Sequence, residues 1–279
     1  MSAPRFVVDP LDPRAPSREV WEQLTESERR HVLMTLPSEF PLTEPPEGDE
    51  HRLPKERALE TLSEFYRSRR RPVYLSAELP IYYPGERMFA PDLLAVLDVE
   101  NHPRDSWVTS HEGKGLDFVL EINVSGSQKK DFEDNVVRYA RLGIPEYFAF
   151  DVRRKRLLGW RLASTDSLTY EAIVPVGGRF SSRVLDLELS LEGGQLRFFH
   201  GTAPLLDAQE LVARLSTMVD EALLRAEEQA RRAEEESRRA EEESRRAEEE
   251  SQRAQQESGR VAKLAARLRE LGVDPDEIV

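Results

Sequence analysis

The chain of 279 residues contains no cysteine and carries a formal net charge of −13 at pH 7. The absence of cysteine excludes a disulfide framework and any cysteine-ligated zinc or iron–sulfur site. The segment from Met1 to Arg5 lacks the apolar run of a signal peptide, and no stretch approaches the roughly 18 consecutive apolar residues of a membrane span. We therefore expect a soluble, cytoplasmic protein.

The negative charge is spread over the whole chain. Residues 226–279 contain 11 Lys and Arg and 16 Asp and Glu. The remaining 29 Lys and Arg and 37 Asp and Glu lie in residues 1–225. Proteins that bind nucleic acid through its phosphates usually carry a basic surface. Composition therefore gives nucleic-acid binding no support, and any such contact has to be local or helped by divalent cations.

Changes in composition divide the chain into four segments. We expect a partly helical N-terminal extension at 1–52, an α/β domain at 53–206, a long charged helix or coiled coil at 207–272 and a tail at 273–279. Within the extension, residues 17–36 have a weakly helical pattern, and Ser17 is a suitable N-cap.

The α/β domain is predicted to begin with an amphipathic helix over residues 54–70. Apolar side chains recur there at helical spacing beneath a charged face, namely Leu59, Leu62 and Tyr66. Two runs rich in apolar and aromatic residues, 73–83 and 93–99, then predict strands, with Pro84-Gly85 as a break between them.

The strand pattern at residues 117–124 alternates between two faces. One face carries Phe118, Leu120, Ile122 and Val124. The other face is polar at two successive positions, Glu121 and Asn123.

The second half of the domain predicts one more helix and several strands. Asp131 is placed to cap a helix with the apolar positions Phe132, Val136, Tyr139 and Leu142, and Gly143 suits a left-handed C-terminal position. Strands are expected at 147–151, 156–162, 170–174 and 196–199, with a hairpin turn at Gly177-Gly178. This order predicts an α/β (α+β) fold with a mixed sheet flanked by helices.

The last segment repeats every seven residues. The block Arg-Arg-Ala-Glu-Glu-Glu-Ser starts at Arg231, Arg238 and Arg245, with a degenerate copy from Gln252. Glu precedes Arg by four residues again and again, which is the favourable orientation and is worth about 0.2–0.5 kcal/mol per pair. A helix over residues 208–271 is predicted, and it would be roughly 95 Å long.

Two interpretations of this helix remain open. Apolar positions at its two ends form a seam, but in the middle the same register holds only alanines with serines beside them. Alanine buries little area, so the middle does not drive tight pairing by burial. The sequence is compatible with a solitary helix stabilised by ion pairs and with a coiled coil held mainly by its ends.

Common catalytic signatures are missing from the sequence. The five histidines, His51 among them, form no close ligand pair, and we expect each to be a surface or packing residue. No phosphate-binding loop and no G-x-S-x-G elbow is present.

A carboxylate pair in strand context remains. Asp92 opens the apolar run at 93–96, and Glu121 lies within another apolar strand. A buried acid is costly unless its charge is paired or bound to a metal. Two such acids on neighbouring strands would make an oxygen-rich site for Mg²⁺, which could activate water for attack on a phosphodiester.

The stretch from Ala90 to Asp151, "APDLLAVLDV … FVLEINVSGSQKKDFEDNVVRYARLGIPEYFAFD", resembles the Uma-type family of restriction endonucleases within the PD-(D/E)XK nuclease superfamily. The resemblance covers residues 53–199, and charged helical tails are frequent in such proteins. It implies a restriction-endonuclease-like core, a DNA substrate and a divalent metal such as Mg²⁺. It also implies that Asp92 and Glu121 are the metal ligands and catalytic acids.

The lysine of that family pattern is replaced in this chain. A strict E-x-K pattern would put it at position 123, where Asn123 stands, and the Uma-type pattern would put it at position 135 after Asp131, where Asn135 stands. Asparagine supplies no positive charge. Lys129 and Lys130 are the nearest cations, and our hypothesis is that one of them replaces the missing lysine; the alternative is that both are solvated loop lysines.

Three functions are compatible with these residues. The first is a Mg²⁺-dependent endonuclease that hydrolyses DNA phosphodiester bonds with metal-activated water. The second is a degenerate nuclease fold that binds nucleic acid or protein, which the two asparagines and the acidic surface favour. The third places the function in the C-terminal helix, as a spacer or as an element that makes a homo-oligomer.

Overall fold

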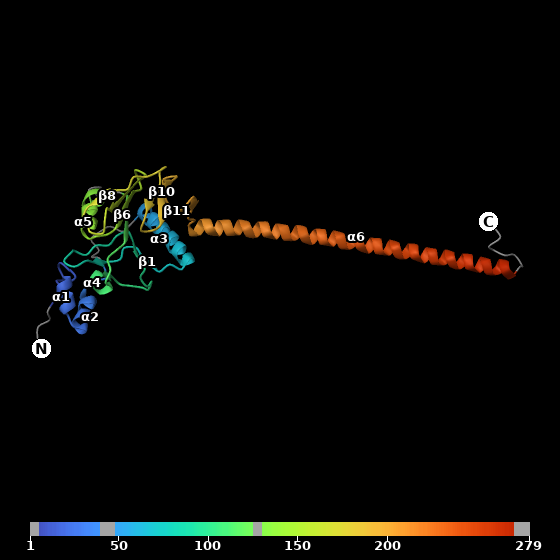
Figure 1. Cartoon of the computed structure of the whole chain (residues 1–279), viewed down its shortest axis with the longest axis horizontal. Coiled ribbons are helices and arrows are strands. Elements are labelled where there is room, and N and C mark those ends of the chain that lie inside the picture. Colours follow the sequence, from blue (N-terminus) through green and yellow to red (C-terminus); the bar gives the residue numbers. More distant parts are fainter. Residues whose placement is uncertain (1–5, 40–47, 125–129, 271–279) are drawn as a thin grey trace. The chain divides into compact units, whose positions relative to one another are not determined.

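The computed structural model describes residues 6–39, 48–124 and 130–270, without the side chains of Lys130, Asp131 and Glu270. The chain divides into two compact units, with the division between Glu210 and Leu211. Figure 1 labels helices and strands of both units. The first unit contains a mixed β-sheet with helices, and the second consists of most of one long helix, α6 (Ala208–Glu270). The predicted fold class is confirmed.

The main sheet of the first unit has six strands in the order β1-β3-β5-β6-β7-β8. Their bounds are β1 (Val73–Ser76), β3 (Leu93–Leu97), β5 (Phe118–Asn123), β6 (Glu146–Asp151), β7 (Arg156–Leu162) and β8 (Tyr170–Ala172). Only β5 and β6 run parallel, and the other neighbours are antiparallel. A parallel pair requires a crossover connection. Here that connection contains η1 (Lys130–Asp134) and α5 (Asn135–Arg141).

Helices cover both faces of this sheet. Phe118, Leu120 and Ile122 of β5 belong to an apolar cluster with α3 (Asp49–Arg69), whereas Val119 belongs to a second cluster with Tyr139 of α5. The alternation predicted for this strand is therefore confirmed. Because both faces are covered, β5 is buried along its whole length, polar residues included.

The N-terminal segment forms a third apolar cluster. Trp21 of α1 (Arg18–Gln23) and Val32 of α2 (Glu26–Thr35) are buried with Tyr82 and Val108. These last two belong to a small parallel sheet of β2 (Ile81–Tyr82) and β4 (Trp107–Val108), which precedes α4 (Thr109–Glu112). Ser17 caps α1 as predicted, but the helical stretch is split in two because Thr25 starts a second helix with its own capping box.

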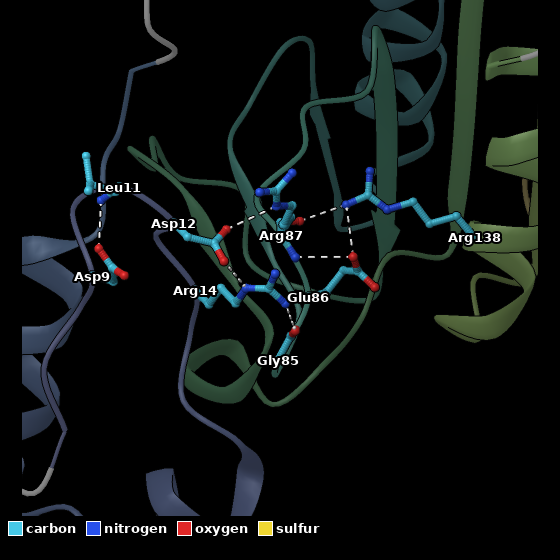
Figure 2. Close-up of polar contacts among 8 residues, drawn as sticks. All are labelled: Asp9, Leu11, Asp12, Arg14, Gly85, Glu86, Arg87 and Arg138. Atoms are coloured by element: carbon cyan, nitrogen blue, oxygen red, sulfur yellow. Dashed lines mark hydrogen bonds and ion pairs between the residues drawn. The ribbon is translucent and has the colours of Figure 1, made fainter.

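Ion pairs also connect the N-terminal segment to the loop between β2 and β3 (Figure 2). Asp12 accepts hydrogen bonds from Arg14 at 2.9 Å and from Arg87 at 3.1 Å. The guanidinium of Arg138 on α5 donates to the carbonyl of Arg87 at 2.7 Å and reaches Glu86 at 3.5 Å. The loop that leads to Pro91 and Asp92 is thus held from two sides.

A second sheet follows the main one and has the order β12-β11-β10-β9. Its strands are β9 (Phe180–Ser182), β10 (Leu187–Glu192), β11 (Gln195–His200) and β12 (Ala203–Pro204). The predicted hairpin turn at Gly177-Gly178 is confirmed: both glycines have positive φ, and Val176 and Arg179 exchange backbone hydrogen bonds.

Two predicted helix starts are wrong. Helix α3 begins at Asp49 after Gly48, so that Pro54 lies inside it rather than at its first position. Asp131 does not cap α5, because the backbone is already helical at Lys130 in η1, whereas an N-cap needs a non-helical backbone. The left-handed Gly143 after α5 is confirmed, with a φ of 73°.

The long helix α6 is confirmed over the described residues, where its 63 residues correspond to about 95 Å. Ion pairs at i,i+4 spacing join Glu221 to Arg225 and Glu242 to Arg246, each at 2.8 Å. None of the described helices combines the length and the apolar character that a membrane span requires.

A buried carboxylate connects the end of the main sheet to the second sheet. Glu146 of β6 is 2% exposed and receives hydrogen bonds from the hydroxyl of Ser182 and, at 2.9 Å, from the backbone N–H of Arg183. Arg161 of β7 forms an ion pair with it at 3.0 Å. The carboxylate therefore binds groups from two separate segments, β7 and the residues around the end of β9.

Replacing Glu146 with alanine is expected to lower the free energy of unfolding by about 3–5 kcal/mol, because Arg161 and the N–H groups would lose their buried partner. Urea unfolding of Glu146→Ala measures this loss. Glu171→Ala, at an exposed position of β8, should stay within about 0.5 kcal/mol of the native protein. A loss of less than about 1 kcal/mol for Glu146→Ala would contradict this role.

Candidate active site

The pairing of β3 with β5 brings two carboxylates together. In the antiparallel register Leu93 pairs with Leu120, so Asp92, directly before β3, lies opposite Glu121. The backbone N–H of Asp92 donates to Oε2 of Glu121 at 3.3 Å, and the N–H of Ile122 donates to Oδ2 of Asp92 at 2.6 Å. The acids singled out in the sequence are thus neighbours at one edge of the buried sheet.

Both acids are largely removed from water. The Asp92 side chain is 15% exposed, and Glu121 is 9% exposed. Two adjacent carboxylates in such surroundings need donors nearby, because burial and mutual repulsion both disfavour the charged forms. The two backbone N–H groups supply part of that compensation.

Tyr139 of α5 supplies a further donor to Glu121. Its hydroxyl donates to Oε1 of Glu121 at 2.5 Å, and its ring is 2% exposed between Phe89 and Tyr147. Burial first, and then the nearby Glu121 carboxylate, raises the pKa of Tyr139 well above its ordinary value of 10.0. The hydroxyl is therefore protonated, and a donor, over the whole neutral pH range.

Helix α3 contributes two residues whose role the sequence pattern did not indicate. His51, which we expected to be a surface or packing residue, places Nε2 3.2 Å from Oδ2 of Asp92. One turn later, Lys55 is 5% exposed and forms an ion pair with Glu78, whose N–H donates to the carbonyl of Pro91 at 2.9 Å. The first two turns of α3 therefore lie beside the Pro91-Asp92 segment.

A signal for these two residues is present in the sequence. His51 and Lys55 are four residues apart and continue, toward the N-terminus, the stripe of α3 that buries Ala58 and Leu62. Polar side chains at the start of a buried helical stripe indicate a polar site at that end of the helix. Pro54 concealed this signal, because it favoured a helix that starts after His51.

The other predicted site residues are only partly described. Asn123 follows Glu121 on the same side of β5 and is 5% exposed, and Asn135 opens α5 and is 4% exposed. Lys130 and Asp131 lie in η1, and their side chains are outside the described part of the chain. Lys129 lies entirely outside the described residues.

The donor set suits a hydrated magnesium ion better than a metal held by protein groups alone. Within the described residues, no group of three or more histidines and acids is arranged to hold a metal. Magnesium usually keeps several waters and is bound through one or two carboxylates. Asp92 and Glu121 fit that requirement, although both Glu121 oxygens also accept hydrogen bonds.

Removing the Tyr139 hydroxyl should lower stability by an amount that depends on pH. Tyr139→Phe loses a hydrogen bond to a charged group, which is worth about 1.5–3 kcal/mol at pH 8. Above pH 10, Tyr139 of the unsubstituted protein ionises in the unfolded state but not in the folded state, because folding raises the pKa of Tyr139. The unsubstituted protein then loses stability that Tyr139→Phe keeps. The difference between their free energies of unfolding should therefore narrow by about 1.4 kcal/mol at pH 11.

Urea unfolding of both proteins at pH 8 and pH 11 tests this expectation. The other tyrosines are present in both proteins, so their ionisation cancels from the difference. A gap of equal size at the two pH values would show that Tyr139 does not keep its proton in the folded state.

Comparisons with known proteins identify the family of the chain. The profile of the Uma2 family, described as "Putative restriction endonuclease", matches residues 21–195, more than half of the chain. A "putative nuclease belonging to DUF820" from Anabaena variabilis is similar in structure, with 15% identity and a TM-score of 0.38, over 58% of this chain and 89% of that one. None of the curated proteins matches. The chain belongs to the Uma2 family of restriction-endonuclease-like proteins.

Proposed function

We propose that this protein is a magnesium-dependent endonuclease that hydrolyses phosphodiester bonds of DNA. The observation that carries the proposal is that the β3–β5 register sets Asp92 opposite Glu121, where the backbone N–H of Asp92 donates to Oε2 of Glu121 at 3.3 Å, in a chain whose family is described as restriction endonucleases. Two largely buried carboxylates on neighbouring strands are costly to keep charged, and a divalent cation offsets that cost.

Each described residue of the site has a distinct task in this proposal. A bound magnesium ion would activate water and neutralise charge on the scissile phosphate. Asp92 and Glu121 would hold it, while the N–H of Ile122 and the hydroxyl of Tyr139 fix the directions of the two carboxylates. His51 keeps Asp92 in place from the opposite face of the sheet.

In this proposal a lysine from the connection between β5 and α5 supplies the positive charge of the site. We propose that Lys129 or Lys130 replaces the lysine that the family pattern places at positions 123 or 135, and orients the attacking water or the phosphate. What supports this is that Asn123 and Asn135 are both buried and uncharged, while the connection that carries the two lysines starts directly after β5.

The remaining assignments follow from the same proposal. The nuclease-like domain is taken as residues 53–206, after the extension 1–52 and before the helical segment 207–272 and the tail 273–279. DNA is the proposed substrate, the cytoplasm the proposed location, and self-association through the helical segment the proposed quaternary state. The acidic body restricts phosphate contacts to local cations such as Arg87, which is 72% exposed near the site.

Neutral isosteres of the two acids test the reaction. Asp92→Asn and Glu121→Gln should each lower the rate of magnesium-dependent cleavage of plasmid and single-stranded DNA at least about a hundredfold, because each removes a charged metal ligand. Glu171→Gln on the exposed β8 is the matched control and should keep the native rate. Native rates in both site variants would overturn the assignment of the carboxylates.

The migrated lysine has its own test. Lys129→Ala and Lys130→Ala are compared in the same cleavage assay, and one of them is expected to lose at least about tenfold in rate with magnesium binding retained. Magnesium affinity is measured by titration calorimetry in parallel. Full activity of both single variants would show that neither lysine serves the reaction.

One observation favours a second candidate function. The two lysine positions of the family pattern hold buried asparagines, which are polar but supply no positive charge to the two acids. A catalytically degenerate nuclease fold would use this site to bind nucleic acid or protein without cutting. It would show salt-sensitive DNA binding and no cleavage with magnesium, a combination that the endonuclease proposal does not allow.

A further inference from the structure

The two ends of α6 carry exposed apolar side chains along one line of the helix. With Val212 as the first position of each seven-residue repeat, the first and fourth positions form a seam. At the N-terminal end this seam contains Val212, Leu215 and Val219, which are 55–66% exposed. At the C-terminal end it contains Val261 and Leu264, which are 61% and 59% exposed, and then Leu268. Isolated from a partner, both ends present apolar area to water.

The middle of the seam favours one orientation of a partner helix, parallel or antiparallel, over the other. Its first positions are all alanines, from Ala226 to Ala254. Its fourth positions are glutamates at four successive repeats, namely Glu236, Glu243, Glu250 and Glu257. A parallel, in-register pair would set each of these glutamates against its own copy. Like charges directly opposite one another destabilise such a pair, so the parallel arrangement is disfavoured.

An antiparallel pair removes this conflict in one particular register. When Leu215 lies opposite Leu268 of a second copy, Val219 lies opposite Leu264 and Ala222 lies opposite Val261. In the same register every seam glutamate lies opposite an alanine; the pairs are 236 with 247, 243 with 240, 250 with 233, and 257 with 226. Large apolar residues thus meet one another, and each glutamate meets the smallest side chain of the seam.

The charges at the ends favour the same orientation. Residues 260–269 contain four cations and no acid, whereas residues 211–224 contain Arg214, Asp220 and Glu221. A parallel pair would bring the two cationic ends together. An antiparallel pair places each cationic end beside a segment with one net negative charge, which is the complementary arrangement.

We propose that α6 is a docking surface for a second copy of this chain, in antiparallel orientation, with Leu215 opposite Leu268. The apolar ends supply the binding energy, and the alanine–glutamate middle fixes the orientation. The two domains that precede α6 are then attached at opposite ends of a rod of about 95 Å. This inference does not depend on DNA cleavage and goes beyond the proposed self-association by fixing its geometry.

The oligomeric state of the full chain tests whether the surface pairs. Sedimentation analysis should show a dimer of the 32.0 kDa chain. Leu215→Glu, in the seam, should raise the dimer dissociation constant at least about tenfold, because it buries a charge against Leu268. Leu224→Glu is the matched control: Leu224 is 63% exposed on the same helix but lies off the seam, so its dissociation constant should match that of the native chain. A monomer at 100 µM, or equal effects of both substitutions, would overturn the proposal.

Single cysteines test the orientation, because the native chain has none. When Ala222→Cys and Val261→Cys chains are mixed and oxidised, they should form a disulfide-linked heterodimer. Two copies of the same variant should not form a disulfide with each other. In one helix these positions are about 58 Å apart, so a link between them has to join two copies. Self-linked Ala222→Cys in place of the mixed dimer would show a parallel pair and refute the proposed register.

Discussion

The need to compensate two neighbouring carboxylates at the edge of an apolar sheet governs the arrangement around the site. Asp92 and Glu121 are held together by the β3–β5 register and are therefore obliged to share one small, poorly hydrated space. Backbone donors, the Tyr139 hydroxyl and His51 converge on them from both faces of the sheet. Helices α3 and α5 thus serve the site as well as the core.

Because the two carboxylates need donors, some residues belong both to the packed core and to the candidate site. Tyr139 is a core residue by burial, since its ring contacts Phe89 and Tyr147, and yet its hydroxyl is directed at Glu121. His51 lies in the first turn of α3, whose later turns place Ala58, Leu62 and Tyr66 in the apolar cluster under the sheet. Changing either residue alters packing and electrostatics together.

Sequence reasoning predicted the strands and the acids because their signals are local. The alternation in β5 and the apolar run after Asp92 are visible over fewer than ten residues, and burial of both faces makes the register of such strands well determined. The hairpin at Gly177-Gly178 was predictable for a similar reason, since two successive glycines favour positive φ. The family resemblance then connected Asp92 to Glu121 before any register was known.

The residues that sequence reasoning missed owe their role to tertiary contacts. Nothing within ten residues of His51 indicates Asp92, 41 positions later, and Tyr139 has the spacing of an ordinary core position in a helix. The predicted first residues of two helices are wrong because tertiary packing overrode the local preference of the sequence. Pro54 lies inside α3, and Asp131 lies inside η1. The pairing of α6 was left open because alanine alone does not decide between a solitary and a paired helix.

The parallel pairing of β5 and β6 determines which part of the chain leaves the sheet beside the acids. Since the chain must leave β5 and travel back across the sheet before it can start β6, its crossover always departs beside Glu121 and Asn123. Glu121 lies within β5 and Asp92 directly precedes β3, so the strand register fixes the positions of both acids. The segment that follows β5 in the sequence therefore begins at the position of these acids, whatever residues it carries.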